Sequence, residues 1–181
     1  SRVVVIDEAY VDFGGESAVG LTKKYDNILV CQTFSKSRSF AGGRLGYGIG
    51  SEALISDLNT VKYSTNPYNI NSMTSAMGIG ILKDGEYTAA NCRTIMENRD
   101  YTVKALEAMG FRVLPSSANF IFVSSDKIDG GEYYRKLKEK KILVRHFDKP
   151  RISSWCRVSI GRIDQMEAFL KATEEILKEK V

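Results

Sequence analysis

Arg2-Val-Val-Val-Ile-Asp7 is a continuous run of mostly β-branched residues that ends in an acid. Such runs are typical of strands buried on both faces of a parallel sheet. Asn27-Ile-Leu-Val-Cys31 is a second such run, and the connection between the two is long enough for a crossover. Leu45–Ile49 predicts a third, glycine-rich strand. Because ligands bind beyond the carboxyl ends of strands in open parallel sheets, we expect the chemistry at Asp7–Tyr10 and Thr33–Lys36.

The whole chain predicts an α/β protein in two parts. Residues 1–80 read as part of a mostly parallel sheet with helices, and 81–181 as a connecting helix, ended by Gly110, followed by a small α/β domain. The chain has no initiator Met and its first strand begins at residue 3, so we expect further sequence upstream. Helices are expected at 51–58, 71–82, 86–109 and 131–141, and further strands at 111–114, 119–123, 142–147 and 156–160.

The last helix has the clearest amphipathic pattern. Asp164, with Glu167 three residues later, resembles a capping box at its N-terminus. The apolar residues that follow recur at the i, i+3, i+4 spacing of one buried helix face. They are Met166, Phe169, Leu170, Thr173, Ile176 and Leu177.

Composition excludes several classes of protein. The 181 residues are 43% hydrophobic and 27% charged, as in a globular protein, and no apolar run approaches the roughly 20 residues that span a bilayer. The start does not resemble a signal peptide, so we expect a cytoplasmic protein with no membrane partner. The formal charge is only +4, and acidic residues interrupt the lysines at 136–141. A solvated helix face explains that cluster better than a nucleic-acid surface.

His146 is the only histidine, which excludes multi-histidine metal sites and makes a histidine-based triad depend on one ring. We expect His146 to have a structural or substrate-edge role. Cys31, Cys92 and Cys156 are odd in number, widely spaced and without a CxxC pair, so they read as reduced thiols. No metal site is expected.

The segment Thr33-Phe-Ser-Lys-Ser-Arg-Ser-Phe-Ala-Gly-Gly-Arg-Leu-Gly-Tyr47 is the most unusual part of the chain. Lys36 follows two hydroxyl residues directly after a predicted strand, and Arg44 stands eight positions later. The glycines match neither GxGxxG nor a phosphate-binding P-loop. Taken alone, the segment fits a polar loop with a snorkelling lysine as well as it fits a site.

Asp7-Glu8-Ala9-Tyr10 makes the chemistry more specific, because pyridoxal 5′-phosphate (PLP) needs four kinds of protein group. Lys36 supplies an amine for a Schiff base. Asp7 supplies an anion for the pyridine nitrogen, and Tyr10 a donor for the phenolic oxygen. The cofactor phosphate needs hydroxyl groups and a guanidinium, which Thr33, Ser35 and Arg44 provide.

These motifs together resemble the histidinol-phosphate aminotransferase family of fold-type-I PLP enzymes. Asp-Glu-Ala-Tyr precedes Thr-Phe-Ser-Lys and Ala-Gly-x-Arg-Leu-Gly-Tyr in that family's order, and Asn66-Pro-Tyr-Asn-Ile70 resembles its next loop. Ile142-Leu-Val-Arg145 and Cys156-Arg157-Val-Ser-Ile-Gly161 resemble its two substrate-arginine segments. The match runs over nearly the whole chain, but a family member is roughly twice as long. The resemblance therefore implies the C-terminal part of a PLP-dependent transferase large domain plus the small C-terminal domain.

The resemblance also implies a role for each residue. Lys36 is the Schiff-base lysine and the base that moves the substrate proton, while Asp7 and Tyr10 contact the pyridine nitrogen and the phenolic oxygen. Ser35 and Arg44 hold the cofactor phosphate, with Thr33 a weaker candidate. Arg157 binds an acidic group such as the α-carboxylate of glutamate, and Arg145 the phosphate of the substrate; surface positions remain open for both arginines. Arg38 is an extra charge near Lys36 for which the resemblance implies no role.

The implied reaction is transamination of L-histidinol phosphate with 2-oxoglutarate by a homodimer, using amino-acid, oxo-acid and phosphorylated substrates. The family's upstream half carries other parts of the cofactor pocket, so we expect this chain alone to be inactive or nearly so. A related aromatic aminotransferase or a threonine-phosphate decarboxylase has most of the same residues. A non-catalytic effector domain of a transcription regulator, or a folding unit without activity, are the alternatives outside the enzyme class.

Overall fold

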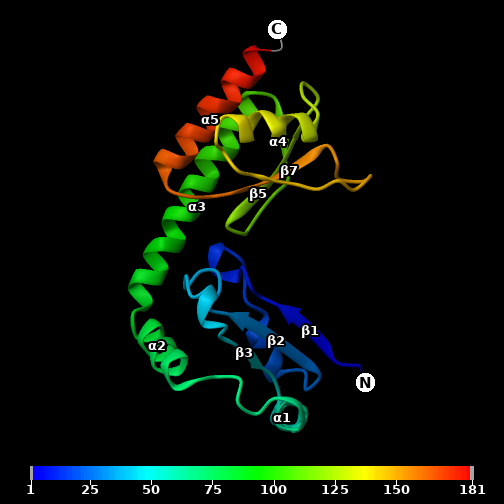
Figure 1. Ribbon diagram of the computed structural model, residues 1–181. Coiled ribbons are helices and arrows are strands. Elements are labelled where there is room, and N and C mark those ends of the chain that lie inside the picture. Colours follow the sequence, from blue (N-terminus) through cyan, green and yellow to red (C-terminus); the bar gives the residue numbers. More distant parts are fainter. Residues whose placement is uncertain (1, 180–181) are drawn as a thin grey trace. The chain divides into compact units, whose positions relative to one another are not determined.

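The computed structural model describes residues 2–179, and the chain divides into two compact units, Ser1–Cys92 and Arg93–Val181 (Figure 1). Each unit contains its own β-sheet and helices. The boundary between them falls inside one long helix, α3 (Gly85–Ala108). The α/β class expected from the sequence is confirmed.

The first unit contains a mixed three-stranded sheet in the order β1-β2-β3. β1 (Val4–Asp7) runs parallel to β2 (Ile28–Thr33), as the crossover-length connection predicts. β3 (Gly46–Ile49) runs antiparallel to β2. The chain after β2 folds into a compact turn with the 3-10 helix η3 (Ala41–Gly43) and returns along the strand it has just left, so no crossover separates β2 from β3.

Burial on both faces, which the run of β-branched residues predicts, holds for β2 but not for β1. Ile28, Leu29 and Val30 of β2 are buried. Val4 and Val5 of β1 are 47% and 59% exposed, so the prediction is wrong for β1 within this chain. Strand side chains project from the two faces of a sheet, and the element that β1 chiefly packs against in the described chain is its neighbouring strand β2, so both faces of β1 are left largely uncovered.

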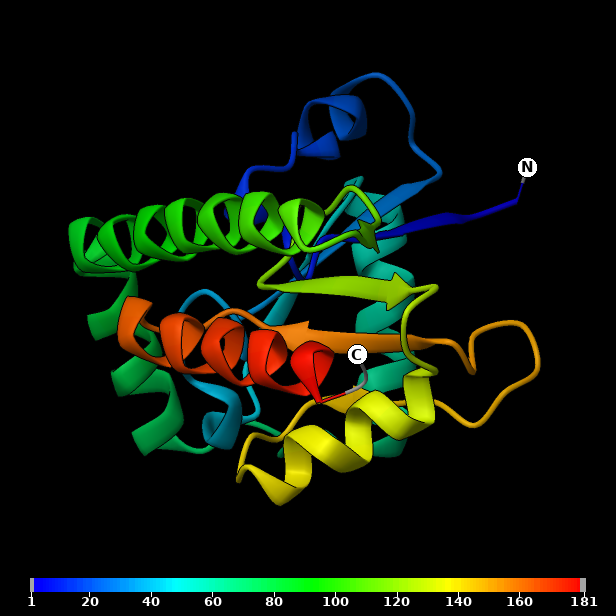
Figure 2. The ribbon, with the colours of Figure 1, turned by 90° about the horizontal axis from the view of Figure 1, so that it is seen from above.

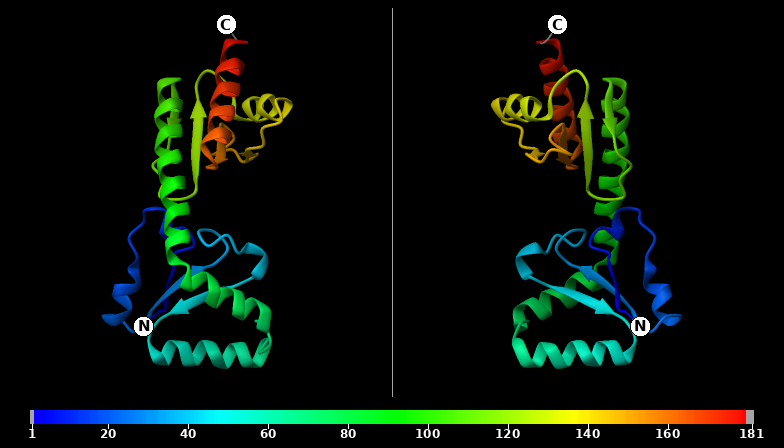
Figure 3. Two further views of the ribbon diagram at one scale, coloured as in Figure 1. Left: turned by 90° about the vertical axis from the view of Figure 1, so that its left-hand side faces the viewer. Right: turned by 90° about the vertical axis from the view of Figure 1, so that its right-hand side faces the viewer.

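Besides η3 and the start of α3, the first unit contains the 3-10 helices η1 (Val11–Phe13) and η2 (Ala18–Lys23). Two α-helices, α1 (Glu52–Thr65) and α2 (Ser72–Lys83), follow β3 in succession (Figure 3). Helix α1 extends seven residues beyond the predicted end at 58. It ends just before Asn66-Pro67, because the residue before a proline is disfavoured in the helical conformation.

The second unit is an antiparallel sheet in the order β4-β5-β7-β6, with helices on one face (Figure 2). Its strands are β4 (Phe111–Val113), β5 (Phe120–Ser125), β6 (Arg145–His146) and β7 (Trp155–Ser159), and its helices are the end of α3, α4 (Gly130–Glu139) and α5 (Ile163–Lys178). The predicted strand 142–147 is thus shortened to two residues. Strand positions Ile121, Val123, Cys156 and Val158 pack with the three helices in one apolar cluster.

The predicted capping box of the last helix is wrong, although its buried face is confirmed. α5 begins at Ile163, so Asp164 lies inside its first turn and Arg162 occupies the N-cap. The side-chain oxygen of Gln165 accepts a hydrogen bond from the Arg162 N–H at 3.0 Å, which is the return bond that Glu167 was expected to make. Of the predicted face, Met166, Phe169, Leu170, Thr173 and Ile176 are buried and Leu177 is partly buried.

Candidate active site

Two loops of the first unit meet at one edge of its sheet. Asp7 ends β1 and is in register with Cys31 of the parallel strand β2. Because carboxyl ends of parallel strands share one sheet edge, Asp7–Tyr10 and Thr33–Lys36 leave the sheet together. The sequence predicted chemistry at this edge, and the structure brings these segments side by side there.

Lys36 is exposed, and its amine lies over the ring of Tyr10, with Nζ 5.6 Å from the ring centroid. Its turn is closed by backbone hydrogen bonds from Ser39 N–H to the Lys36 carbonyl at 3.0 Å and from Phe40 N–H to the Phe34 carbonyl at 2.9 Å. Ser39 has φ 52°, in the left-handed region that few residues other than glycine adopt. The contact unites the predicted lysine and the predicted phenol in one place.

Asp7 is exposed at the end of β1, where a carboxylate can meet a cation without first being desolvated. Its Oδ1 accepts a hydrogen bond from the Ala9 N–H at 3.0 Å, which orients the carboxyl group at the start of the loop. Asp7 and Lys36 are thus an accessible anion and an accessible amine on neighbouring loops.

Glu8, to which the sequence assigned no role, is the buried acid of this edge. It is 7% exposed and accepts hydrogen bonds from Ser17 Oγ, Ala18 N–H and Gln32 Nε2 at 2.9, 2.5 and 2.8 Å. Burial by itself raises the pKa of the Glu8 carboxyl, but the bonds from Ala18, Gln32 and Ser17 outweigh burial and hold this pKa below its ordinary value. The partners come from distant segments, which explains why spacing along the sequence did not reveal the role of Glu8.

The predicted phosphate ligands lie on the turn between β2 and β3. Thr33 Oγ1 accepts from the Ser35 N–H at 3.1 Å and lies 3.5 Å from the Leu45 carbonyl, so this hydroxyl stabilises the turn itself. Arg44 is exposed, has φ 52°, and donates from Nη1 to the Ala41 carbonyl at 3.0 Å. Thr33 and Gly46 are the last paired residues of β2 and β3, so Ser35 and Arg44 both lie two residues beyond the end of the ladder. The Thr33 hydroxyl is thus engaged within the turn, and the Arg44 guanidinium is exposed at its surface.

Arg145 and Arg157, the predicted substrate residues, lie in the second unit as direct partners on β6 and β7. Opposite residues of an antiparallel pair project from the same face of a sheet, with Cβ atoms about 5 Å apart. This is the face away from the helices, because the buried residues of β7 are Cys156 and Val158. The Arg145 guanidinium lies 5.4 Å from the Phe147 ring centroid, and that of Arg157 lies 5.2 Å from that of Phe120.

Two like charges placed opposite each other destabilise a sheet unless something compensates them. Within residues 2–179, neither Arg145 nor Arg157 is within 4.0 Å of an acidic side chain, and the buried Nε of Arg157 has no hydrogen-bond partner. An anionic ligand would compensate both guanidinium groups.

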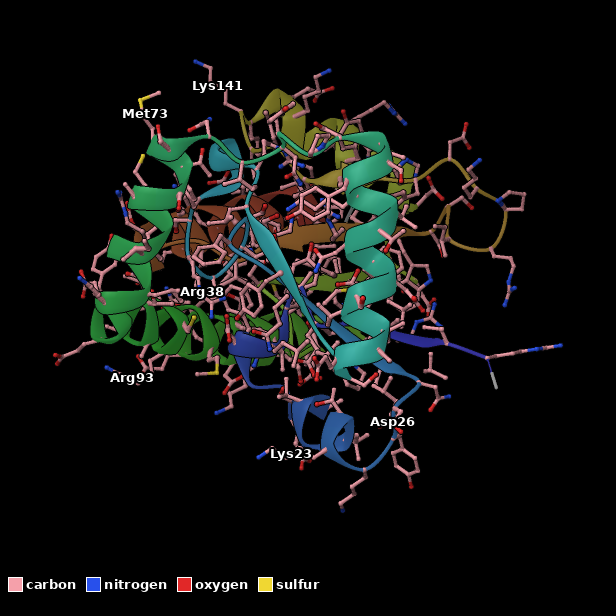
Figure 4. The ribbon with its side chains drawn as sticks, turned by 90° about the horizontal axis from the view of Figure 1, so that it is seen from below. Lys23, Asp26, Arg38, Met73, Arg93 and Lys141 are labelled. Atoms are coloured by element: carbon pink, nitrogen blue, oxygen red, sulfur yellow. The ribbon has the colours of Figure 1, made fainter. Side chains whose placement is uncertain are left out.

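Arg38 points into the first unit, whereas Met73 on α2 points outward (Figure 4). Its Nη1 is 3.2 Å from Asp12 Oδ2 and 3.4 Å from the Thr33 carbonyl, and its guanidinium lies 5.2 Å from the Phe34 ring centroid. It lies between two shallow cavities of about 360 and 300 Å³. Arg38 therefore stabilises the turn that carries Lys36.

The remaining titratable groups have structural surroundings. The His146 ring is 2.6 Å from the Ser153 carbonyl and stacks on Tyr134, which fits the expected structural role. Lys136 and Lys140 form ion pairs with Glu175 of α5 and with Glu179, the C-cap residue of that helix. The three cysteines are free, and burial raises the pKa of the Cys156 thiol to about 12.

Two negative findings concern residues 2–179. No group of three or more His, Cys, Asp or Glu side chains in this range is arranged to hold a metal ion. None of the helices in the same range combines the length and the apolar character that crossing a bilayer requires.

The residues at the sheet edge fit a PLP cofactor by the chemistry of the groups they present. An accessible amine, a phenol beside it, a carboxylate on the adjacent strand end, and a hydroxyl with a guanidinium on the following turn are the four kinds of group PLP requires. All of these groups come from the first unit, and the facing pair Arg145 and Arg157 lies in the second.

Comparisons with known proteins agree with this chemistry. The sequence matches the family "Aminotransferase class I and II" over residues 1–172. It is 45% identical over 177 residues to the histidinol-phosphate aminotransferase of Clostridium botulinum (strain Okra / Type B1), covering 98% of this chain and 50% of that protein. The chain thus spans about half the length of the curated relatives it matches.

Solved structures show the same fold. The structure of the histidinol-phosphate aminotransferase from Clostridium acetobutylicum superposes with a TM-score of 0.88 at 28% identity, over 98% of this chain and 55% of that one. The Sinorhizobium meliloti histidinol-phosphate aminotransferase in complex with pyridoxal-5′-phosphate gives 0.82 at 21% identity, over 99% and 50%. At that identity the second likeness concerns the fold alone.

Proposed function

Because this chain belongs to the class I and II aminotransferase family, we propose that it carries the lysine-bearing part of a PLP-dependent aminotransferase site. The proposed reaction is transamination of L-histidinol phosphate with 2-oxoglutarate. The observation that carries the proposal is the exposed Lys36 amine over the Tyr10 ring at the edge where Asp7 ends β1. Residues 1–80 are then the C-terminal part of the cofactor-binding large domain, and residues 81–181 the connecting helix and the small C-terminal domain.

PLP, when bound through a lysine amine, supplies a ring that absorbs the electron pair left when a substrate Cα loses its proton. Asp7 is proposed to pair with the pyridine nitrogen, since a carboxylate there keeps that nitrogen protonated. Tyr10 would donate a hydrogen bond from its hydroxyl group to the phenolic oxygen. Ser35 and Arg44, and more weakly Thr33, bind the cofactor phosphate, for which a guanidinium is the best-matched side chain.

Lys36 is also proposed to move the substrate proton. Its amine is accessible and, in its free form, would act as the base within the site. A lysine base explains how a chain with a single histidine, held against the Ser153 carbonyl, supports acid–base chemistry.

Arg145 and Arg157 are proposed to bind the anionic groups of the substrates. Arg145 would bind the phosphate of L-histidinol phosphate, and Arg157 a carboxylate such as that of glutamate. Their facing positions and the lack of acidic partners within residues 2–179 support this assignment. Substrates are thus small amino acids, oxo-acids and a phosphorylated compound.

The complete enzyme is proposed to be a cytosolic homodimer, and this chain alone to turn over slowly or not at all. The low activity expected of this chain alone is supported by its coverage of only about half of each matched relative. The test is to add the upstream half of the protein in trans and to measure transamination. Recovery of activity with both halves, and none with either alone, is expected; ordinary turnover by this chain alone would contradict the proposal.

The proposed cofactor lysine is tested by intact mass after incubation with PLP and borohydride reduction. One added PLP is expected in the wild type and none in Lys36→Ala. Lys62→Ala is the matched control, because Lys62 Nζ lies 5.4 Å from the centroid of the Tyr63 ring, a similar contact outside the site. An adduct that survives in Lys36→Ala would disprove the assignment. If the wild type forms none, the same test on the full-length protein decides.

A further inference from the structure

We propose that Asp12 is a positioning residue that sets the geometry of Lys36 relative to Tyr10. This inference rests on the proposed function, since it concerns the lysine of that site. It gives a role to the charged pair formed by Asp12 and Arg38, for which neither the sequence motifs nor the chemistry of the cofactor implies one.

The first observation is that Asp12 binds the two residues directly after Lys36. Ser37 Oγ donates a hydrogen bond to Asp12 Oδ2, and Arg38 Nη1 lies 3.2 Å from the same oxygen. Ser37 is buried and the Arg38 side chain is 15% exposed. The Asp12 side chain is 32% exposed, so the pair is only partly shielded from water; charge-assisted hydrogen bonds are nevertheless stronger than bonds between neutral groups. Asp12 therefore holds the carboxyl-terminal side of the Lys36 turn.

The second observation is that Arg38 also holds the amino-terminal side of the turn. Its Nη1 donates to the Thr33 carbonyl at 3.4 Å, and its guanidinium stacks over Phe34, which is 3% exposed. Thr33 ends β2. One guanidinium thus links the strand end, the turn and the Asp12 carboxylate, so a shift of Asp12 is transmitted to both sides of Lys36.

The third observation is that Asp12 and Tyr10 belong to the same short 3-10 turn. Tyr10 is the N-cap residue of η1, Asp12 lies within η1, and the Phe13 N–H donates to the Tyr10 carbonyl at 3.1 Å. The buried Phe13 side chain fixes this turn in the first unit. The distance between Asp12 and the Lys36 turn therefore also sets the distance between the Tyr10 ring and the Lys36 amine.

A misplacement of about 1 Å between reacting groups lowers catalytic rates by roughly 100-fold in some enzymes. We expect Asp12→Ala, which removes both contacts, to lower kcat by about 10- to 100-fold with a smaller change in the KM for glutamate. Asp12→Asn keeps an acceptor for Ser37 but loses the charge that faces Arg38, and should fall between Asp12→Ala and the wild type.

The experiment uses the full-length enzyme loaded with PLP, and Asp57→Asn, an exposed acid on α1, is the matched control. Besides kcat and KM, the visible absorbance of the Lys36-bound cofactor is titrated with pH. A change in the surroundings of the Lys36 nitrogen should move the midpoint by roughly half a pH unit or more in Asp12→Ala, and not in the control. A role limited to fold stability would lower the unfolding temperature and leave the midpoint unchanged.

An Asp12→Ala enzyme with the wild-type midpoint and the wild-type kcat overturns the inference. If Asp12→Ala does not fold, kcat and the absorbance midpoint are measured for Ser37→Ala, which removes one hydroxyl donor to Asp12. Wild-type values of both in this variant would likewise overturn the inference. Failure of the proposed function is recognised separately, because in that case the wild-type full-length protein forms no borohydride-stable adduct at Lys36.

Discussion

The ionised form of Glu8 stabilises the sheet edge. Its carboxylate receives three hydrogen bonds from η2 and β2, and its pKa lies below the ordinary value of 4.5. A group whose pKa is lowered by folding stabilises the folded state above its unfolded pKa and stops doing so as pH falls through its folded pKa. The free energy of unfolding should therefore fall as pH drops below about 4.5.

Glu8→Gln should remove this pH dependence and cost about 1–3 kcal/mol at pH 7, because an amide NH2 would then face donors that now meet an oxygen. Urea unfolding at pH 7 and at successively lower pH measures both effects. Glu16→Gln, at an exposed position, is the control and should behave like the wild type. If Glu8→Gln keeps the wild-type dependence below pH 4.5, another acid is responsible.

The proposed roles of Arg145 and Arg157 can be distinguished by measuring the KM for each substrate. Loss of one charge-assisted phosphate contact costs about 1.5–3 kcal/mol, so Arg145→Ala should raise the KM for L-histidinol phosphate roughly 10- to 100-fold. The KM for glutamate should change much less. Steady-state kinetics of the full-length enzyme tests this, with Arg112→Ala, an exposed arginine paired with Asp126, as control. Equal increases in both KM values would argue against a phosphate role for Arg145.

At the scale of elements, α4 can approach the loop before β7 only because its first residue is glycine. A Cβ at Gly130 would lie 2.6 Å from the Ser153 carbonyl oxygen and 2.6 Å from the Ser154 carbonyl carbon. Both are backbone atoms, so the chain itself must move to admit a methyl group. The Gly130 carbonyl also accepts a hydrogen bond from the buried Cys156 thiol at 3.3 Å.

Gly130→Ala should lower the free energy of unfolding by about 1–3 kcal/mol. Gly85→Ala is the matched control: Gly85 is likewise the first residue of a helix, and a Cβ there would meet nothing within 4 Å. The control should be neutral or slightly stabilising. Fluorescence of Trp155, the single tryptophan, reports unfolding next to the substituted site. Equal stabilities of the two variants would show that the loop carrying Ser153 and Ser154 can move to admit the methyl group without loss of stability.

At the scale of the whole molecule, the two units differ in how much apolar surface they bury. The contiguous core cluster, from Leu106 to Ile176, lies entirely in the second unit. The first unit buries few large apolar side chains, and its β1 is largely exposed. Apolar burial is the main favourable term in folding, so the first unit should open at a lower free energy.

Amide hydrogen exchange measured by mass spectrometry tests this difference. We expect the amides of β2 to exchange faster than those of β5, although both are central strands with six residues. Exchange of the unfolded chain corrects for intrinsic rates. β2 amides protected as well as those of β5 would show that the first unit is as stable as the second.

Much of the fold and of the candidate site followed from local sequence patterns. The β-branched runs predicted β1 and β2, the amphipathic spacing predicted the buried face of α5, and the residues after the two strands predicted where Lys36 and Tyr10 meet. These signals lie within one element or within the residues that directly follow it. They therefore depend on strand propensity, helical periodicity and the shared edge of parallel strands, all of which can be read along the chain.

Other features were decided only by the tertiary structure. Glu8 is buried among η2 and β2, Arg38 pairs with Asp12 across 26 positions, and Arg145 faces Arg157 because of the register between β6 and β7. The exposure of β1 depends on which elements pack against its two faces. Each is set by which segments pack together and in what register. A charged side chain takes its role from the partners that this packing brings within hydrogen-bond distance, and spacing along the sequence does not specify them.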